Sequence, residues 1–168
     1  MGKEKVKALI KEYLPFTLFV LLIIGIRIFI CSPINVNGSS MSTTLKDGDI
    51  MLLNKIGLKK GINRFDIVVV KNDGSYLIKR VVGLPNETLS YKDEKLYING
   101  KVVEDKYNLN FTGDIEPIEI GNNEYFVMGD NRNISKDSRM IGTIKKDRII
   151  GKTNFVIYPF NKFGKVEK

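Results

Sequence analysis

Hydrophobic and polar positions divide the chain into one long apolar segment and a series of short ones. Residues 14–31 are apolar except for Thr17 and Arg27. A stretch of this length lies near the lower limit of about 17–25 residues for a helix that crosses a bilayer. Four lysines precede it, and such lysines favour a cytoplasmic N-terminus. The pattern predicts a transmembrane anchor at residues 14–31 behind a cytoplasmic segment at residues 1–13.

Two other fates of this apolar segment fit the following residues less well. A cleaved signal peptide has a shorter apolar region and ends in a small-x-small pattern, which Ile30-Cys31-Ser32-Pro33 lacks. Lipid attachment at Cys31 would favour a small residue just before it, whereas Ile30 is bulky. We therefore expect a retained single anchor in the plasma membrane, with the lipid bilayer as a partner and residues 32–168 outside the cytoplasm.

The part after Pro33 has the pattern of strands. Short runs rich in β-branched and aromatic residues alternate with turn residues, and no long amphipathic helix appears. Asn99-Gly100 between two such runs is a strong signal for a type I′ hairpin. We expect a mainly β, antiparallel domain in which the polar stretch 93–123 forms a small β-ribbon insertion. The expected strands are 49–54, 66–70, 76–82, 95–98, 101–103, 125–128 and 154–158.

Composition excludes several classes of chemistry. The chain of 168 residues contains no histidine and one cysteine, Cys31. Ser-His-Asp and Cys-His mechanisms, His-ligated metals, four-cysteine zinc sites and an intramolecular disulfide are therefore impossible within this chain. A hydrolase built on it must take its base from Lys, Asp, Glu or the N-terminus. We expect no metal and no cofactor.

The formal net charge of +8 is compatible with an anionic partner. Nucleic acid and an anionic membrane are both such partners, and a solvated basic surface explains the charge equally well. No block of basic residues typical of a nucleic-acid tail is present; the runs are pairs such as Lys59-Lys60 and Lys145-Lys146. Together with the predicted anchor, this pattern favours the membrane, and we expect no nucleic acid.

Four segments concentrate polar residues or glycines beside predicted strands: Val36–Leu45, Gly48–Ile50, Tyr76–Pro85 and Gly129–Arg139. Taken singly, each has an ordinary explanation as a loop after a membrane helix, a turn, an edge strand or a solvated polar loop. The functional explanation of the first is a tight turn that exposes a hydroxyl, and that of the last is a hydrogen-bonded scaffold. The residues alone do not decide between these alternatives.

The third of these segments places two cations next to each other in an apolar strand. Alternation puts Lys79 on the face shared by Leu77 and Val81, and Arg80 on the other face. Lysine and arginine are rarely buried without a partner. The pair therefore indicates either a half-exposed edge strand or a functional site.

Together, five stretches resemble type I signal peptidases in their short form with a single N-terminal anchor. In chain order they are GSSMSTTL, GDIMLLNK, RFDIVVV, YLIKRVVGLP and GDNRNISKDSRMIG. The resemblance implies that Ser40, immediately before Met41, is the nucleophile and that Lys79 is its general base. The residues alone do not choose Ser40 over Ser39 or Ser42; only the family register does.

The same resemblance implies supporting roles for other residues. Ser135 corresponds to a serine that hydrogen-bonds the lysine, and the Ser40 N–H is expected to donate to the oxyanion. Some members carry a donating serine at the position of Gly38, so the second oxyanion donor stays open. The supporting positions of the predicted site are Gly38, Ser39, the pair Arg80 and Asp130, Ser135, and the ion pair Asp137 and Arg139.

A Ser/Lys pair works only when the lysine is neutral. At an unperturbed pKa of about 10.4 few lysines are neutral at pH 7, but burial lowers such a pKa by up to about 3–5 units. The apolar neighbours of Lys79 fit that requirement. Neutral Lys79 would take the Ser40 proton, and Ser40 would form an acyl-enzyme. The implied reaction removes signal peptides with small residues at −1 and −3 from secretory preproteins, which are bound by β-augmentation.

Two other functions stay open on the sequence. Self-cleaving repressor-type proteases use a similar Ser/Lys pair, but they are soluble, and the anchor at residues 14–31 disfavours them. A non-enzymatic membrane-anchored binding module would use the same polar cluster only as a scaffold. A covalent serine probe separates the second alternative, because a binding module would not react with it.

Overall fold

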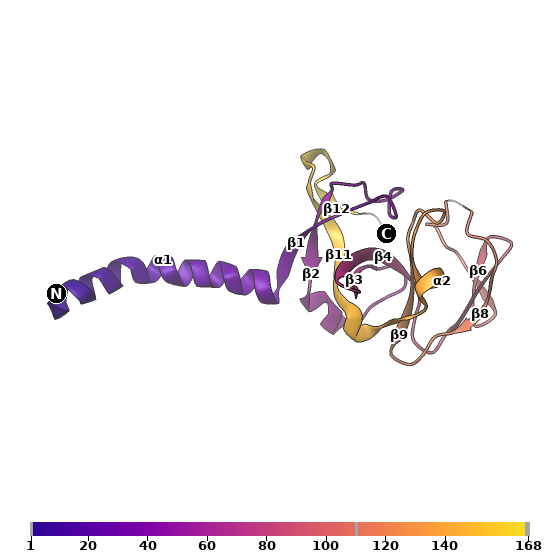
Figure 1. The fold of residues 1–168 in the computed structure, drawn as a ribbon, viewed down its shortest axis with the longest axis horizontal. Helices are drawn as coiled ribbons and strands as arrows, with labels where there is room; N and C mark the ends of the chain where they lie inside the picture. Colours follow the sequence, from indigo (N-terminus) through magenta and orange to yellow (C-terminus); the bar gives the residue numbers. More distant parts are fainter. Residues whose placement is uncertain (1, 110, 167–168) are drawn as a thin grey trace.

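The computed structural model describes residues 2–109 and 111–166, and its longest element is α1 (Lys3–Phe29), which projects away from the rest of the chain (Figure 1). The helix begins well before the predicted segment 14–31, because Lys, Glu, Ala and Leu are good helix formers. It ends at Phe29, and Cys31 already belongs to a strand. Within the described residues α1 alone is long and apolar enough to cross a membrane.

Eight antiparallel strands form the first sheet, in the order β1-β2-β11-β3-β4-β9-β10 with β12 paired to β11. Its early strands are β1 (Cys31–Asn35), β2 (Ile50–Asn54), β3 (Ile67–Asn72) and β4 (Ser75–Gly83). Its late strands are β9 (Glu124–Met128), β10 (Ile144–Lys145), β11 (Ile149–Tyr158) and β12 (Gly164–Lys165). Between them lie four short helices: η1 (Ile56–Lys60), α2 (Ser138–Ile141), η2 (Lys146–Arg148) and η3 (Phe160–Lys162).

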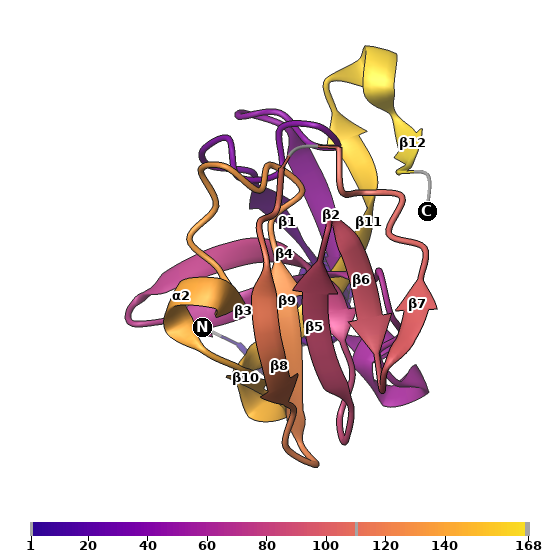
Figure 2. The same ribbon diagram turned by 90° about the vertical axis from the view of Figure 1, so that its right-hand side faces the viewer.

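A second, four-stranded sheet has the order β7-β6-β5-β8 and lies at the end of the domain away from α1 (Figures 1 and 2). The outlying ribbon expected at residues 93–123 is part of this sheet, which already begins at β5. The hairpin at Asn99-Gly100 is confirmed, because both residues have positive φ and Ile98 pairs with Lys101. The strands are β5 (Thr88–Lys92), β6 (Lys95–Ile98), β7 (Lys101–Val103) and β8 (Ile115–Glu119).

The predicted fold class is confirmed: a mainly antiparallel β domain follows one N-terminal apolar helix. Several strands lie outside the predicted runs, among them β1, β5, β8 and the first half of β11. β1 contains Pro33 and β8 contains Pro117, and each of these strands lies at the end of its sheet. Edge positions tolerate proline because one side of the strand needs no ladder hydrogen bond.

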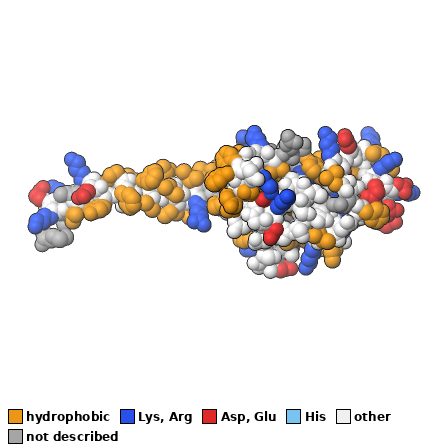
Figure 3. All heavy atoms as spheres, turned by 90° about the horizontal axis from the view of Figure 1, so that it is seen from above, with side chains coloured by type: hydrophobic (Ala, Val, Ile, Leu, Met, Phe, Trp, Pro, Cys, Tyr) orange, Lys and Arg blue, Asp and Glu red, His pale blue; other side chains and the backbone are white. Residues whose placement is uncertain are grey.

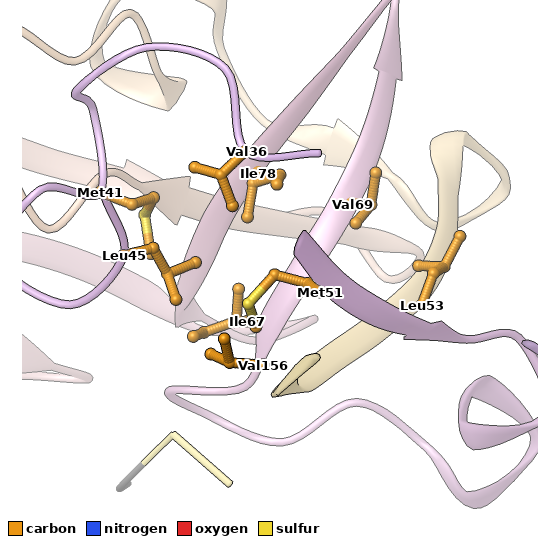
Figure 4. Packing of buried hydrophobic residues seen from close by; sticks show 9 residues of the cluster. All are labelled: Val36, Met41, Leu45, Met51, Leu53, Ile67, Val69, Ile78 and Val156. Atoms are coloured by element: carbon orange, nitrogen blue, oxygen red, sulfur yellow. The ribbon is translucent and has the colours of Figure 1, made fainter. Parts of the chain in front are cut away.

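Buried apolar side chains tie the segment after β1 to the first sheet. Met41 and Leu45 are almost fully buried and pack with Met51, Ile67 and Ile78 in one cluster (Figure 4). Their burial fixes the backbone of a loop that has no regular structure of its own. The remaining members of this cluster are Val36, Leu53, Val69 and Val156.

Another buried cluster joins the two sheets. It combines Val82 and Phe126 of the first sheet with Leu89 and other residues of the second. At Gly83, a Cβ would lie 2.3 Å from Cδ1 of Ile120, so only glycine allows β4 to approach this closely. The second sheet is therefore packed onto the strands that carry the candidate site.

Candidate active site

Ser40 and Lys79 come from distant parts of the chain and meet in the structure. Ser40 lies in the loop between β1 and β2, and Lys79 lies in the middle of β4. Lys79 Nζ is 2.7 Å from Ser40 Oγ and donates a second hydrogen bond to Ile78 O at 3.1 Å. At the first distance a protonated amine donates to the hydroxyl, and a neutral amine can accept the hydroxyl proton.

The polar loop after β9 holds the backbone around Ser40. The Asn131 N–H donates to Ser40 O at 2.9 Å. The Asn131 side-chain amide donates to Ser39 O at 3.2 Å and to Ser42 Oγ at 2.9 Å. These hydrogen bonds connect the Ser40 loop to the segment that follows β9, and the buried Met41 holds the same loop against the core. Together they fix the Ser40 hydroxyl relative to Lys79.

Burial sets the protonation of Lys79. Its side chain is buried in the strand, with the residue only 3% exposed. This burial lowers the pKa of the Lys79 amine below its ordinary value of 10.5, while the negative charges of Asp137 and Asp130 act in the opposite direction. Neither carboxylate hydrogen-bonds the amine, and each is held by an arginine. The neutral form of Lys79 is therefore favoured relative to a lysine in water.

Asp130 and Arg80 form a buried ion pair on the other face of β4. The Arg80 guanidinium donates to both carboxylate oxygens, from Nε at 2.8 Å and from Nη2 at 2.6 Å. It also donates to Phe65 O at 2.8 Å, and its Cζ lies 3.4 Å from the centroid of the Tyr107 ring. The Thr44 hydroxyl donates to the same carboxylate, which links the pair to the Ser40 loop.

Asp137 and Arg139 form a second pair next to the site. Arg139 Nε and Nη2 donate to the two Asp137 oxygens, each at 2.9 Å. The same carboxylate accepts the Gly129 N–H at 3.0 Å and caps α2 by accepting the Arg139 N–H. Arg139 Nη2 also donates to Arg132 O at 2.6 Å, which closes the loop onto itself.

The hydrogen bond expected between Ser135 and Lys79 is not formed. Ser135 is buried, and among the described residues its Oγ has no hydrogen-bond partner. The hydroxyl lies instead against Gly129, where a Cβ would be 2.2 Å from Ser135 Oγ and 2.5 Å from Ser40 O. Lys79 already bonds to Ser40 and to a main-chain carbonyl, so Ser135 contributes packing beside the Ser40 backbone in this arrangement.

Gly38 and Ser39 precede the nucleophile candidate in an exposed turn. The Gly38 N–H donates to Asp47 Oδ1 at 2.7 Å, and Gly38 has φ +86°, a conformation that disfavours a serine there. Ser39 contributes its main-chain carbonyl to Asn131. The Ser40 N–H has no acceptor in the part of the chain that the structure describes, so it is free to donate to an oxyanion.

The sequence argument missed several residues of this network. Gly129 and Asn131 lie in the polar stretch that the sequence singled out, but nothing in their types indicated contacts with the Ser40 loop. Arg132 is 2% exposed and pairs with Asp105 at 2.7 Å, which joins the site to the second sheet. Its other buried partners are the Tyr91 hydroxyl at 3.1 Å and Thr112 Oγ1 at 3.2 Å. Such long-range pairs leave no local pattern in the sequence.

A groove of about 780 Å³ leads to the Ser40–Lys79 pair. One wall comes from residues 33–37 at and beyond β1, and the other from residues 75–79 of β4. Within residues 2–109 and 111–166 both walls have free strand edges, since β1 pairs only with β2, and β9 pairs with β4 only from Arg80 onward. No cluster of His, Cys, Asp or Glu that could hold a metal occurs among the described residues.

Comparison with known proteins decides the family. The family described as "Signal peptidase, peptidase S26" matches residues 9–158. The chain belongs to this family. It is 39% identical to signal peptidase I T of Bacillus subtilis (strain 168), with 96% of this chain and 91% of that protein covered. It is 37% identical to signal peptidase IB of Staphylococcus aureus (strain N315), with 97% of this chain and 94% of that protein covered.

The fold is also similar to a solved signal peptidase. The crystal structure of a signal peptidase I from Enterococcus faecalis V583 matches with a TM-score of 0.50 and 34% identity. The match covers 54% of this chain and 95% of that chain. The resemblance read from the five sequence stretches is thus confirmed: this is a type I signal peptidase of the short form, a serine endopeptidase with one N-terminal apolar helix.

Proposed function

We propose that this signal peptidase cleaves preproteins with Ser40 as nucleophile and Lys79 as general base. The observation that carries the proposal is the distance of 2.7 Å between Ser40 Oγ and a lysine amine whose pKa is lowered by burial. A serine hydroxyl is a weak nucleophile that needs an adjacent base, and this chain has no histidine to provide one. Lys79 is the base within reach of Ser40.

The proposed reaction proceeds in two steps. Neutral Lys79 takes the Ser40 proton while Ser40 Oγ attacks the scissile carbonyl, and the free Ser40 N–H donates to the oxyanion. The lysinium then protonates the leaving amine as the peptide bond breaks, which leaves an acyl-enzyme on Ser40. In the second step Lys79 deprotonates a water that attacks this ester, and the resulting lysinium returns the proton to Ser40 Oγ as the acyl group leaves. Arg80 and Arg139 hold the two nearby carboxylates and thereby limit their effect on the Lys79 pKa.

The groove favours an extended peptide as substrate. A chain laid between residues 33–37 and residues 75–79 can add main-chain hydrogen bonds to both free edges, as in β-augmentation. Side chains that point into the groove meet Ile34, Val36 and Ile78 close to Ser40. This apolar lining favours apolar side chains in the bound peptide, and the preference for small residues at −1 and −3 is what membership of the family implies.

The apolar helix supports a membrane location for the reaction. Figure 3 shows hydrophobic side chains along the middle of α1, with charged side chains at its free end. We propose that residues 14–31 span the plasma membrane, that residues 1–13 lie in the cytoplasm, and that residues 32–168 form the extracytoplasmic catalytic domain. In spheroplasts an added protease should then digest the domain and spare the first dozen residues. Protection of the domain would contradict this orientation.

Cleavage of a preprotein by the detergent-solubilised protein tests the proposed chemistry. We expect one cut, directly after a small residue, when the products are mapped by mass spectrometry. A Ser40→Ala variant prepared in the same way is the control for contaminating proteases. Cleavage that survives in this variant would contradict the assignment of Ser40.

A further inference from the structure

The joint between the membrane helix and the first sheet consists of one residue. α1 ends at Phe29 and β1 begins at Cys31, so only Ile30 lies between them (Figure 1). Cys31 pairs with Asn54, so the β1–β2 ladder starts at the first residue of β1. The helix therefore passes into the sheet without a linker.

Lys55 binds the end of α1 with both its backbone and its side chain. Its N–H donates to Ile30 O at 3.0 Å, and its Nζ donates to Ile28 O at 2.9 Å and to Arg27 O at 3.2 Å. The Ser32 hydroxyl donates to Arg27 O as well, at 2.7 Å. The last carbonyls of a helix lack intrahelical donors and carry partial negative charge. Lys55 provides both the missing donors and a positive charge.

A neighbouring lysine shows that these bonds are particular to Lys55. Lys59 lies four residues further on, in η1, and carries the same charge. Its side chain is exposed and, within the described part of the chain, makes no hydrogen bond and no ion pair. Lys55 is half-buried instead, and the three hydrogen bonds that it donates all reach the joint.

The joint is close to the substrate groove along β1. Pro33 and Ile34 line the groove, and Ile34 lies four positions after Ile30, which is about 13 Å at about 3.3 Å per residue. A change of angle at Ile30 would therefore move the groove relative to the bilayer. A substrate whose apolar segment is still in the membrane cannot follow that movement, whereas a short peptide in solution can.

We propose that Lys55 is a positioning residue that fixes the catalytic domain on its membrane helix and so holds Ser40 at the height where membrane-held preproteins present their scissile bond. The proposal rests on the function proposed above. It concerns the placement of the groove and not the chemistry, so the two can fail separately.

The test compares two substrates of the full-length protein in vesicles of phosphatidylethanolamine and phosphatidylglycerol. One substrate is a preprotein inserted through its signal peptide, and the other is a short soluble peptide with the same cleavage sequence. In Lys55→Met we expect kcat/KM on the inserted preprotein to fall roughly threefold to tenfold, since charge-assisted hydrogen bonds are lost at a partly exposed site. Activity on the soluble peptide should stay within about twofold of wild type. Lys55→Arg should retain most of the wild-type kcat/KM on the inserted preprotein.

Lys59→Met is the matched control, because it removes the same charge without removing a hydrogen bond. An equal loss in Lys59→Met would overturn the proposal in favour of a charge effect at the lipid surface. An equal loss on both substrates in Lys55→Met would assign Lys55 to general stability, and no loss on either would leave it without a positioning role. If the wild-type protein cleaves neither substrate, the proposed function fails, and the rigid joint must be tested without activity.

A distance measurement supplies that test. Spin labels at Leu21→Cys on the helix and Glu116→Cys on β8, in a Cys31→Ser background, report the angle between helix and domain. We expect a narrow distance distribution that broadens when Lys55→Met is added and stays narrow when Lys59→Met is added. A distance distribution that has the same width with and without Lys55→Met would overturn the proposal, whatever the activity data show.

Discussion

Lys79 and Arg80 are adjacent basic residues in β4, and their side chains lie in different environments on opposite faces of the strand. Both are almost fully buried, at 3% and 1% exposure. Arg80 has a bidentate carboxylate partner in Asp130, whereas the Lys79 amine hydrogen-bonds to a hydroxyl and a main-chain carbonyl. An arginine stays charged and must be paired when buried, but a lysine can lose its proton instead. One face of the strand therefore stabilises a charge, and the other favours its removal.

This contrast explains why the site contains two carboxylates that do not touch the lysine. Asp130 and Asp137 raise the Lys79 pKa through space, but Arg80 and Arg139 bind them at close range. Because each carboxylate is bound by an arginine, neither forms a direct ion pair with Lys79. We infer that the polar network serves to keep a neutral lysine beside Ser40. The following predictions test the difference between a lysine that loses its charge and an arginine that keeps it.

The largest expected effect is on activity when the Ser40–Lys79 pair is broken. Lys79→Met should lower kcat by at least about 10²–10⁴-fold, the usual contribution of a general base, and Ser40→Ala should abolish cleavage. Because a nucleophile and its base act as a unit, the double variant should be little worse than either single one. Cleavage of a soluble peptide measures all three.

Ser39→Ala is the control for the register of the nucleophile. Its side chain lies in an exposed turn and only its main-chain carbonyl is bound by Asn131, so activity should stay close to that of wild type. An inactive Ser39→Ala together with an active Ser40→Ala would show that the neighbouring serine is the nucleophile.

The second expected effect is on stability, and it should differ between substitutions of Arg80 and of Lys79. Arg80→Met leaves Asp130 as a buried unpaired charge and should lower the free energy of unfolding by about 3–5 kcal/mol. Lys79→Met removes a buried amine that has no carboxylate contact, so it should leave stability unchanged or raise it. Thermal unfolding followed by circular dichroism in detergent compares the two variants.

The pH dependence of the Lys79→Met effect sharpens this comparison. A lysine whose pKa is lowered in the folded state binds its proton more tightly when unfolded, so wild-type stability rises with pH between the lowered pKa and 10.5. The advantage of Lys79→Met should be greatest below the lowered pKa and should shrink as pH rises through it. A variant that is destabilised like Arg80→Met at every pH would contradict the difference between the two faces.

A smaller loss of stability and activity is expected for a substitution of Gly129, which lies between Ser135 and the backbone of Ser40. A Cβ there would lie 2.2 Å from Ser135 Oγ and 2.5 Å from Ser40 O, and the latter is a backbone atom. Gly129→Ala should therefore cost roughly 1–3 kcal/mol of stability through overpacking and lower activity by displacing Ser40. Gly25→Ala is the control, because a Cβ at Gly25 would meet nothing within 4 Å and both its stability and its activity should stay close to those of wild type. Equal kcat values for Gly129→Ala and wild type would contradict the close packing at Ser40.

Sequence alone predicted the features that local patterns determine. Alternating apolar runs and Asn99-Gly100 indicated an antiparallel β domain, and the lack of histidine required another base. The edge strands β1 and β8 were not predicted, because Pro33 and Pro117 weaken the strand pattern in the sequence. Only the assembled sheets show that each strand lies at an edge. The second sheet was underestimated because β8 was missed for this reason and because β5, which contains no proline, was not predicted either.

The site could be predicted only at the positions where the sequence matches the motifs of type I signal peptidases. That register chose Ser40 over its neighbouring serines and selected Lys79, and these assignments stay predictions until activity is measured. The contact between Asp105 and Arg132 could not be predicted, because residues far apart in sequence meet only after both sheets have packed. The bond expected from Ser135 to Lys79 was wrong for this structure, where close packing at a glycine decides the position of the hydroxyl.

The pH dependence of kcat/KM on a soluble peptide tests the central claim most directly, because it reports the ionisation of the free enzyme's base. With neutral Lys79 as the base, activity should rise with pH through one ionisation whose pKa lies below 10.5. In Arg139→Ala the uncompensated charge of Asp137 should move this rising limb to higher pH, provided circular dichroism shows an intact fold. A profile that is flat from about pH 5 to 9, with chemistry limiting the rate, would contradict a lysine base that burial keeps neutral.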